Sequence, residues 1–163
     1  MKQANLKLFI VWLIFLLSTV SCLSETTDYS FSGELQEFYH SNGLIVRLPK
    51  TLTARVKETG FIIEPTDALN VRSRNTLLVS VTRQSVVELV SLSNIRQKTV
   101  DKRTISYAID RTDGGSGGDQ YNFTAWEQVE TGGLIVYQEA EQSEDGEPRF
   151  ANGWQIIANT QLR

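Results

Sequence analysis

The first residues whose types and spacing suggest chemistry form a glycine cluster. The run from Gly114 to Asp119 reads Gly-Gly-Ser-Gly-Gly-Asp and matches one copy of the GGxGxD calcium-binding nonapeptide. Sites of that kind lie between successive turns of a stacked β-helix, and the sequence contains no second copy. Asp110 and Asp113 lie nearby, but their spacing is not that of an EF-hand. We therefore predict a hairpin turn whose glycines permit positive φ, with no metal site or other cofactor; an ion at this loop stays the open alternative.

Nucleophilic catalysis has little support in the sequence. His40 is the only histidine, and the GxSxG pattern of a nucleophile elbow is absent. A zinc site would need more histidine or cysteine than the chain contains. His40 is expected at the surface, beside a turn at Asn42 and Gly43.

Paired carboxylates are the remaining catalytic option, because two acids can hydrolyse a glycosidic bond. The chain has 19 acidic residues, so many pairs exist, but none sits in a recognisable motif. One acidic run is more simply explained as a solvated strand end and loop, and it comprises Glu139, Glu141, Glu144, Asp145 and Glu147. No catalytic residue is predicted.

The start of the chain has the layout of an export signal. Lys2 and Lys7 form a basic start, the ten residues from Leu8 to Leu17 are all apolar, and small residues follow up to Cys22. Ten residues span about 15 Å as a helix, roughly half of a bilayer's hydrocarbon core, so the run is too short for a transmembrane anchor. Residues 1–21 are predicted to be a signal peptide.

Cys22 is the only cysteine, so no disulfide can form within the chain. The residues Thr19, Val20 and Ser21 before it resemble the lipobox of bacterial lipoproteins, with Thr19 departing from the usual leucine. The resemblance implies that Cys22 is the lipidation site, carrying several acyl chains such as palmitate, and that Leu23 directs the protein to the outer membrane. A plain secreted protein with an odd cysteine is the alternative.

Composition limits what the mature chain can bind. Removal of residues 1–21 deletes two lysines and no acid, so the formal net charge falls from −3 to −5. A moderately acidic domain is a poor candidate for nucleic acid, which selects clustered Lys and Arg. Residues 22–33 are predicted to be the lipidated cysteine and a tether, and residues 34–163 a single β-rich globular domain.

Alternating apolar residues predict strands through most of the domain. Such runs cover Leu44–Leu48, Phe61–Ile63 and Leu77–Thr82, while Glu34–His40 and Ser85–Leu92 fit more than one structure. The runs Ile105–Asp110, Tyr121–Val129 and Leu134–Glu141, joined by glycine-containing turns, indicate an antiparallel meander. Arg96, Lys98, Lys102 and Arg103 are expected to form a basic, solvated connection before it.

One helix is predicted, at the end of the chain. Phe150, Trp154, Ile157 and Ala158 form one apolar stripe at helical spacing, preceded by Pro148. The predicted fold is therefore α+β: a mainly antiparallel β-sheet, arranged as a meander, with a C-terminal helix packed on it.

The meander places two loops at the same end of the sheet, because its first and third strands run parallel. These loops are Arg111–Gly118 and Ser143–Pro148. Their acidic residues could then form one rim suited to binding a basic cleft. The residues predicted to bind a partner are Asp113, Ser116, Asp119, Glu144, Asp145 and Glu147.

Several motifs together resemble a known family. They are Gly60–Pro65 (Gly-Phe-Ile-Ile-Glu-Pro), the glycine cluster, the run Ala125–Glu127, the lipobox and the Phe150–Trp154 ending. The set is similar to periplasmic immunity lipoproteins of bacterial type VI secretion, over most of Asn42–Leu162. The resemblance implies a non-enzymatic inhibitor, lipid-anchored in the periplasm, whose partner is a secreted peptidoglycan-degrading muramidase whose substrate groove it plugs.

Two other classes stay open from the sequence alone. A structural or assembly lipoprotein of the outer membrane would copurify with an envelope complex in cells without any effector. A small envelope hydrolase would act on peptidoglycan and lose that activity when single acids are replaced.

Overall fold

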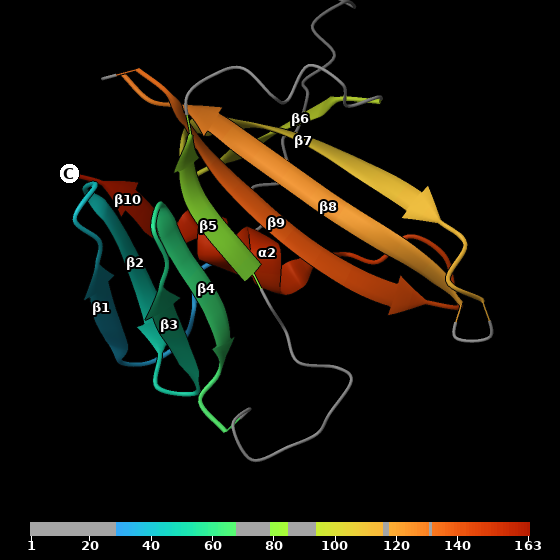
Figure 1. Ribbon diagram of the computed structural model, residues 1–163, viewed down its shortest axis with the longest axis horizontal. Helices are drawn as coiled ribbons and strands as arrows, with labels where there is room; N and C mark the ends of the chain where they lie inside the picture. Colours follow the sequence, from blue (N-terminus) through green and yellow to red (C-terminus); the bar gives the residue numbers. More distant parts are fainter. Residues whose placement is uncertain (1–28, 68–78, 85–93, 116–117, 131) are drawn as a thin grey trace, which may run out of the picture.

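The computed structural model describes residues 29–67, 79–84, 94–115, 118–130 and 132–163. These residues form two antiparallel sheets and one helix (Figure 1). The predicted signal peptide, Cys22, most of the tether, Ser116 and the ambiguous segment 85–92 lie outside the described residues. Within the described ranges, the structure contains no helix long and apolar enough to cross a bilayer.

The larger sheet has seven strands in the order β3-β4-β5-β9-β8-β7-β6, all in antiparallel pairs. Its three longest strands, of ten residues each, extend to the right in Figure 1 beyond the rest of the molecule. The strand bounds are β3 Leu52–Val56, β4 Gly60–Pro65, β5 Val79–Gln84, β6 Arg96–Val100, β7 Arg103–Thr112, β8 Asp119–Gln128 and β9 Leu134–Ser143.

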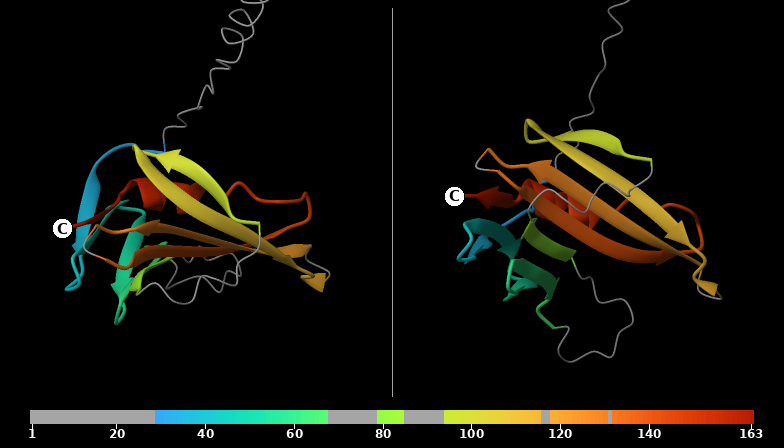
Figure 2. Two further views of the ribbon diagram at one scale, coloured as in Figure 1. Left: turned by 90° about the horizontal axis from the view of Figure 1, so that it is seen from above. Right: turned by 45° about the horizontal axis from the view of Figure 1, so that its top comes forward.

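The smaller sheet has three strands in the order β1-β2-β10. Its strands are β1 Leu35–Tyr39, β2 Leu44–Pro49 and β10 Thr160–Leu162, so it joins the two ends of the domain. The helix α2 (Ala151–Ala158) comes between β9 and β10 and lies on one face of the long strands (Figure 2, left). Residues 34–40, whose structure the sequence left undecided, thus contain an edge strand.

The prediction of a mainly antiparallel sheet with one C-terminal helix is confirmed. The larger sheet as a whole is not a simple meander, because β5 pairs with β9 rather than with β6. Strands β3, β4 and β5 are neighbours in chain order, and so are β6, β7, β8 and β9. The sequence also missed the second sheet, since three-residue β10 is too short to show an alternating pattern.

The core lies between the two sheets and the helix. Leu44, Val46 and Leu48 of β2 are fully buried, as their alternation predicts. On β8, Phe123 stacks on Phe150 with ring centroids 5.1 Å apart and meets the edge of Trp154 at the same distance. The apolar stripe of α2 therefore packs on the buried face of the long strands, which fixes the helix against the sheet.

Side chains from the larger sheet form hydrogen bonds with backbone groups at both ends of helix α2. Its N-cap residue, Phe150, has φ 48° and offers no capping side chain; instead Glu139 Oε2 on β9 accepts a hydrogen bond from the Gly153 N–H, at 2.9 Å. At the other end, Arg103 on β7 donates to the carbonyl oxygens of Ile157 (2.5 Å) and Thr160 (3.2 Å). The Arg103 cation at the C-terminus also interacts favourably with the helix dipole.

Glu139 corrects one prediction. The sequence placed it in a solvated acidic run, but its side chain is only 4% exposed and lies beneath α2. Burial raises the pKa of Glu139 to about 7, the hydrogen bond from Gly153 opposes this rise, and the nearby charge of Glu141 adds to it. Gly153 is required for the contact, because a Cβ there would lie 2.5 Å from Glu139 Oε2.

Two further predictions are corrected by the structure. His40 is buried rather than at the surface: its Nε2 hydrogen-bonds the Lys57 carbonyl at 2.8 Å, and its ring packs edge-on against Phe61. The basic run 96–103 is solvent-exposed at Arg96 and Lys102, as expected, but it is not a mere connection, because it forms β6, a two-residue turn and the start of β7. The turn residues Asp101 and Lys102 both have positive φ, which suits the right-handed twist of a tight hairpin.

Candidate functional site: an acidic tip on three long strands

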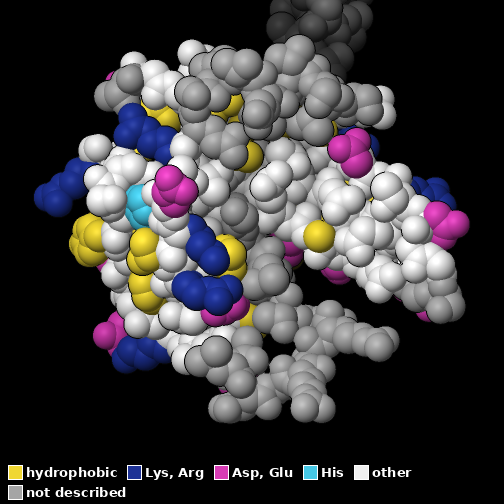
Figure 3. Space-filling view, viewed as in Figure 1, with side chains coloured by type: hydrophobic (Ala, Val, Ile, Leu, Met, Phe, Trp, Pro, Cys, Tyr) yellow, Lys and Arg dark blue, Asp and Glu magenta, His cyan; other side chains and the backbone are white. Residues whose placement is uncertain are grey.

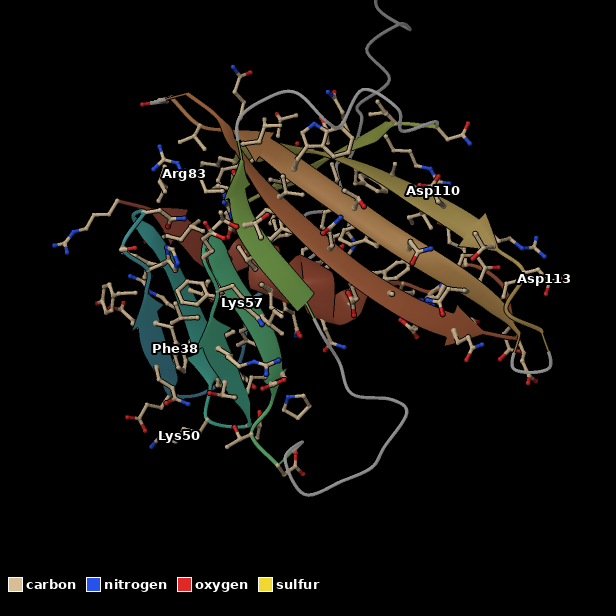
Figure 4. All side chains as sticks on the ribbon, in the orientation of Figure 1. Phe38, Lys50, Lys57, Arg83, Asp110 and Asp113 are labelled. Atoms are coloured by element: carbon tan, nitrogen blue, oxygen red, sulfur yellow. The ribbon has the colours of Figure 1, made fainter. Side chains whose placement is uncertain are left out.

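The far end of the three long strands brings two loops together. The described residues of the β7–β8 turn (112–115 and 118–119) and the β9–α2 loop (residues 143–149) lie side by side there, since Asp119 pairs with Ser143 in the β8–β9 register. We call these two segments the acidic tip. Figure 4 shows Asp113 at this end, on the far side of the molecule from Lys50 and Lys57.

Close backbone contacts hold the two loops of the tip together. Gly118 has φ +84°, and a Cβ at this position would lie 2.6 Å from the Ser143 carbonyl oxygen. Only glycine permits both that conformation and that approach. The Gln142 side chain also donates to the Gly114 carbonyl oxygen across the two segments, at 3.3 Å. The glycine cluster therefore allows the two loops to meet.

Short side-chain bonds order the exposed backbone of each loop. Asp113 Oδ1 accepts a hydrogen bond from the Gly115 N–H at 2.8 Å, which makes an Asx turn. Ser143 Oγ accepts one from the Asp145 N–H at 3.3 Å in the second loop. The tip is thus a shaped surface built on strands rather than a loose end.

The acidic residues of the tip differ in how far they are already paired. Asp119 pairs with Arg111, and Glu147 accepts two hydrogen bonds from Arg96, at 2.8 and 3.2 Å. Each bond raises the pKa of its arginine above the ordinary value. Among the described residues, no cation lies within ion-pair distance of Glu144 or Asp145, and both are exposed.

The predicted partner-binding residues can now be placed. Asp113, Asp119, Glu144, Asp145 and Glu147 all lie on the acidic tip. Acidic side chains are visible along the right-hand arm in Figure 3. Ser116 lies outside the described residues, and so does Cys22.

Comparison with known proteins decides the family. Residues 45–161 match the type six secretion immunity 3 domain. The chain is also 34% identical over 125 residues to the protein named Immune protein Tsi3 of Pseudomonas aeruginosa, which covers 76% of this chain and 80% of that protein. The chain belongs to the type six secretion immunity 3 family.

Members of this immunity family neutralise an effector of type VI secretion, so the partner of the chain is a secreted protein. The matched residues run from β2 to β10 and include both loops of the tip. The resemblance seen in the sequence is confirmed at this level, as an immunity protein of type VI secretion.

A hollow at the opposite end of the long strands is the other feature with clustered polar groups. It has a volume of about 880 Å³ and includes Arg103, Glu127 and Ile135 in its lining. Arg103 Nη1 and the Tyr137 hydroxyl both donate to Glu127 Oε1, each at 2.7 Å. Burial raises the pKa of Tyr137 well above its ordinary value, and the Glu127 charge adds to the effect, so the phenol stays neutral. These groups satisfy one another and stabilise the fold.

The sequence patterns were not interpreted as placing charged residues in the interior, although strand alternation indicated burial of Glu139. Strand alternation puts Glu139 on the same face as the buried Tyr137, two residues earlier. The ion pair between Arg103 and Glu127, in contrast, can be inferred only once β7 is known to pair with β8. Within the described ranges, no three His, Cys, Asp or Glu side chains are grouped to hold a metal ion.

Proposed function

We propose that this immunity protein is a non-enzymatic inhibitor of a peptidoglycan-degrading muramidase effector, acting in the periplasm from a lipid anchor on Cys22. In this proposal the acidic tip enters the substrate groove of the effector and excludes the glycan strand. The observation that carries it is the meeting of two loops at one end of three long strands, with exposed carboxylates on both.

The charge of the tip fits the chemistry of such a groove. The stem peptides of peptidoglycan carry free carboxylates, so a groove that binds it is expected to present basic groups. Glu144 and Asp145 have no cation partner among the described residues, so each can pair with a basic residue of the effector without first breaking an existing ion pair. Complementary charge also speeds the encounter of two proteins, most strongly at low salt.

The shape of the tip supports inhibition by occupancy. The strands β7, β8 and β9 carry it beyond the rest of the domain (Figure 1), and the loops are joined by the close backbone approach at Gly118 and by the hydrogen bond from Gln142 to Gly114. A preorganised projection loses little conformational entropy on binding, which favours tight association. Inhibition of this kind needs no catalytic group in the immunity protein.

The anchor and the location are proposed from the residues at the start of the chain. The segment before Cys22 resembles a signal peptide with a lipobox, and an acylated cysteine would hold the domain in the compartment where a muramidase reaches its substrate. Mass spectrometry of the protein from membranes should find Cys22 as the acylated first residue. An unmodified mature chain would contradict the anchor and leave inhibition untouched.

The function is tested with the muramidase effector secreted by the same bacterium and purified cell-wall sacculi. The mature protein should stop release of soluble muropeptides at a one-to-one ratio. Muropeptide release that continues at tenfold excess would overturn the muramidase assignment.

The surface is tested with the double variant Glu144→Lys, Asp145→Lys. We expect binding to weaken by about tenfold or more, mainly through slower association at low salt. The matched control is Glu58→Lys with Glu130→Lys, which reverses two exposed acids away from the tip. Equal affinities for both double variants would show that the tip is not the binding surface, even if inhibition itself is confirmed.

A further inference from the structure

The β9–α2 loop of the acidic tip is fixed by the fold at both of its ends. At its start, Ser143 pairs with Asp119 in the β8–β9 register. At its end, Phe150 is only 2% exposed and belongs to the core, so α2 begins from a buried residue. Six residues, 144–149, lie between these two ends. A span of six residues could take many conformations if nothing held its middle, and each of them would have to be lost on binding.

Arg96 holds the middle of this span from another strand. It belongs to β6, the outermost strand of the larger sheet beside β7 (Figure 1), and lies 51 positions before Glu147 in the sequence. Its guanidinium nitrogens donate to both carboxylate oxygens of Glu147, at 2.8 and 3.2 Å. Such a bidentate bond fixes the orientation of the carboxylate as well as its distance. The contact leaves only Glu144, Asp145 and Gly146 between two fixed points of the loop.

The guanidinium of Arg96 is itself placed by an aromatic ring. Arg96 and Tyr107 are opposite each other in the β6–β7 register, and Arg96 Cζ lies 6.0 Å from the centre of the Tyr107 ring. The Tyr107 ring packs in a T-shaped contact with Trp154 on α2, with the ring centroids 5.1 Å apart. A cross-strand neighbour and a cation–π contact both restrict a long side chain. The Arg96 side chain is therefore held between this ring and the Glu147 carboxylate, although it is partly exposed.

This pairing changes the role expected for Glu147. An acid that meets a basic residue of the effector must first give up any cation that it already has. Glu144 and Asp145 have no cation within ion-pair distance among the described residues, whereas both oxygens of Glu147 are bonded to Arg96. Glu147 was predicted from the sequence to bind the partner, but its contacts suit it to hold the loop instead.

We propose that Arg96 is the positioning residue of the acidic tip. It fixes the β9–α2 loop through Glu147, so that Glu144 and Asp145 meet the effector in one preset arrangement, while Arg96 itself does not touch the effector. This role depends on the function proposed above, in which the tip enters the effector. A loop that is already ordered favours tight binding, because fewer residues lose conformational freedom when the complex forms.

The first test uses the mature protein without any effector. Backbone order parameters from ¹⁵N relaxation should be near about 0.85 for residues 144–147, and Arg96→Met should lower them to about 0.6 or less, because the unheld span grows from three residues to six. The matched control is Arg47→Met, which breaks an ion pair with Glu37 of the same 2.8 Å length and similar exposure in the smaller sheet. It should leave the loop unchanged. Unaltered order parameters in Arg96→Met would overturn the proposal.

The second test separates positioning from charge. Arg96→Met makes the tip more negative by one charge, and Glu147→Ala makes it less negative by one, so a purely electrostatic role would change the affinity for the effector in opposite directions. We expect both variants to bind about fivefold more weakly, which corresponds to the loss of one well-formed exposed ion pair. The double variant should bind no more weakly than either single variant, because each substitution removes the same contact. Opposite changes, or losses that add in the double variant, would contradict the positioning role.

Failure of the tip and failure of Arg96 give different results. If the double variant Glu144→Lys, Asp145→Lys binds the effector as tightly as its control, the tip is not the binding surface, and Arg96 has no role in binding even if it orders the loop. If that double variant loses affinity while Arg96→Met and Glu147→Ala keep it, the tip binds the effector and the role proposed for Arg96 is wrong.

Discussion

The acidic tip and the region beneath helix α2 each contain an ion pair between an arginine and a carboxylate. The pair at the tip is exposed to water, whereas the pair beneath the helix is largely buried. At the tip, Arg111 pairs with Asp119 in water, with the arginine side chain 67% exposed. Beneath the helix, Arg103 pairs with Glu127, whose side chain is only 10% exposed, and also bonds two carbonyl oxygens. Exposed ion pairs contribute little to stability, whereas removal of one member of a buried ion pair strongly destabilises the fold.

This difference separates binding from folding within one long strand. Arg103 and Arg111 both lie on β7, eight residues apart. Arg103 stabilises the helix and is not accessible to a binding partner. Arg111 lies on the surface, where its partner Asp119 can form an ion pair with another protein instead. The three predictions below each change one side of this comparison.

The largest effect is expected from Arg103→Met, which leaves the Glu127 carboxylate without its cation and two carbonyl oxygens without a donor. We expect the free energy of unfolding to fall by about 3 kcal/mol, measured by urea denaturation at pH 7. The matched variant Arg111→Met should cost less than about 0.5 kcal/mol. Similar losses from the two variants would show that the pair beneath the helix is no better shielded from water than the pair at the tip.

A pH dependence should come from Glu139. Its pKa is about 7 in the folded chain, against 4.5 as the ordinary value, so the folded state keeps a proton that the unfolded chain releases. Stability is then greatest below pH 4.5 and falls as the pH rises through 7, by about 2.5 kcal/mol between pH 5 and 8 from this group. Glu139→Gln should remove this part of the slope and be more stable than the native chain at pH 8. If the same pH dependence of stability persists in Glu139→Gln, it arises from other titratable groups.

The smallest effect is expected at the tip backbone. Gly118→Ala must strain a φ of +84° and push a Cβ against the Ser143 carbonyl, which should cost about 1–2 kcal/mol and lower the melting temperature. Gly115→Ala has a similar φ of +73° but open space around the Cβ, so it should cost about 1 kcal/mol and leave effector binding unchanged. If the two alanine variants bind the effector equally, the close approach of the loops does not shape the site.

Sequence patterns predicted the parts of this fold that depend on periodicity. Alternation located the buried face of β2 and of β8, and helical spacing located the stripe on α2 that carries Trp154. The common end of the turn after β7 and the loop after β9 also followed from strand directions alone. That is why the acidic residues of the tip were found together.

What the sequence missed depends on contacts between distant segments. His40 is buried because a carbonyl at Lys57 and the ring of Phe61 enclose it, and no local pattern encodes either contact. The second sheet requires β10 to return to β2 across more than a hundred residues. Lipidation of Cys22 and the role of Ser116 stay predictions, since both residues lie outside the described ranges.

The dependence of α2 on groups from the sheet has a consequence for the order in which the protein folds. An eight-residue helix with no capping side chain at its N-terminus does not form in isolation, because nucleation costs more than so few bonds return. Arg103 and Glu139 come together only after β7, β8 and β9 have paired, so the helix has to form last. We therefore expect substitutions within α2 to accelerate unfolding while leaving the folding rate nearly constant.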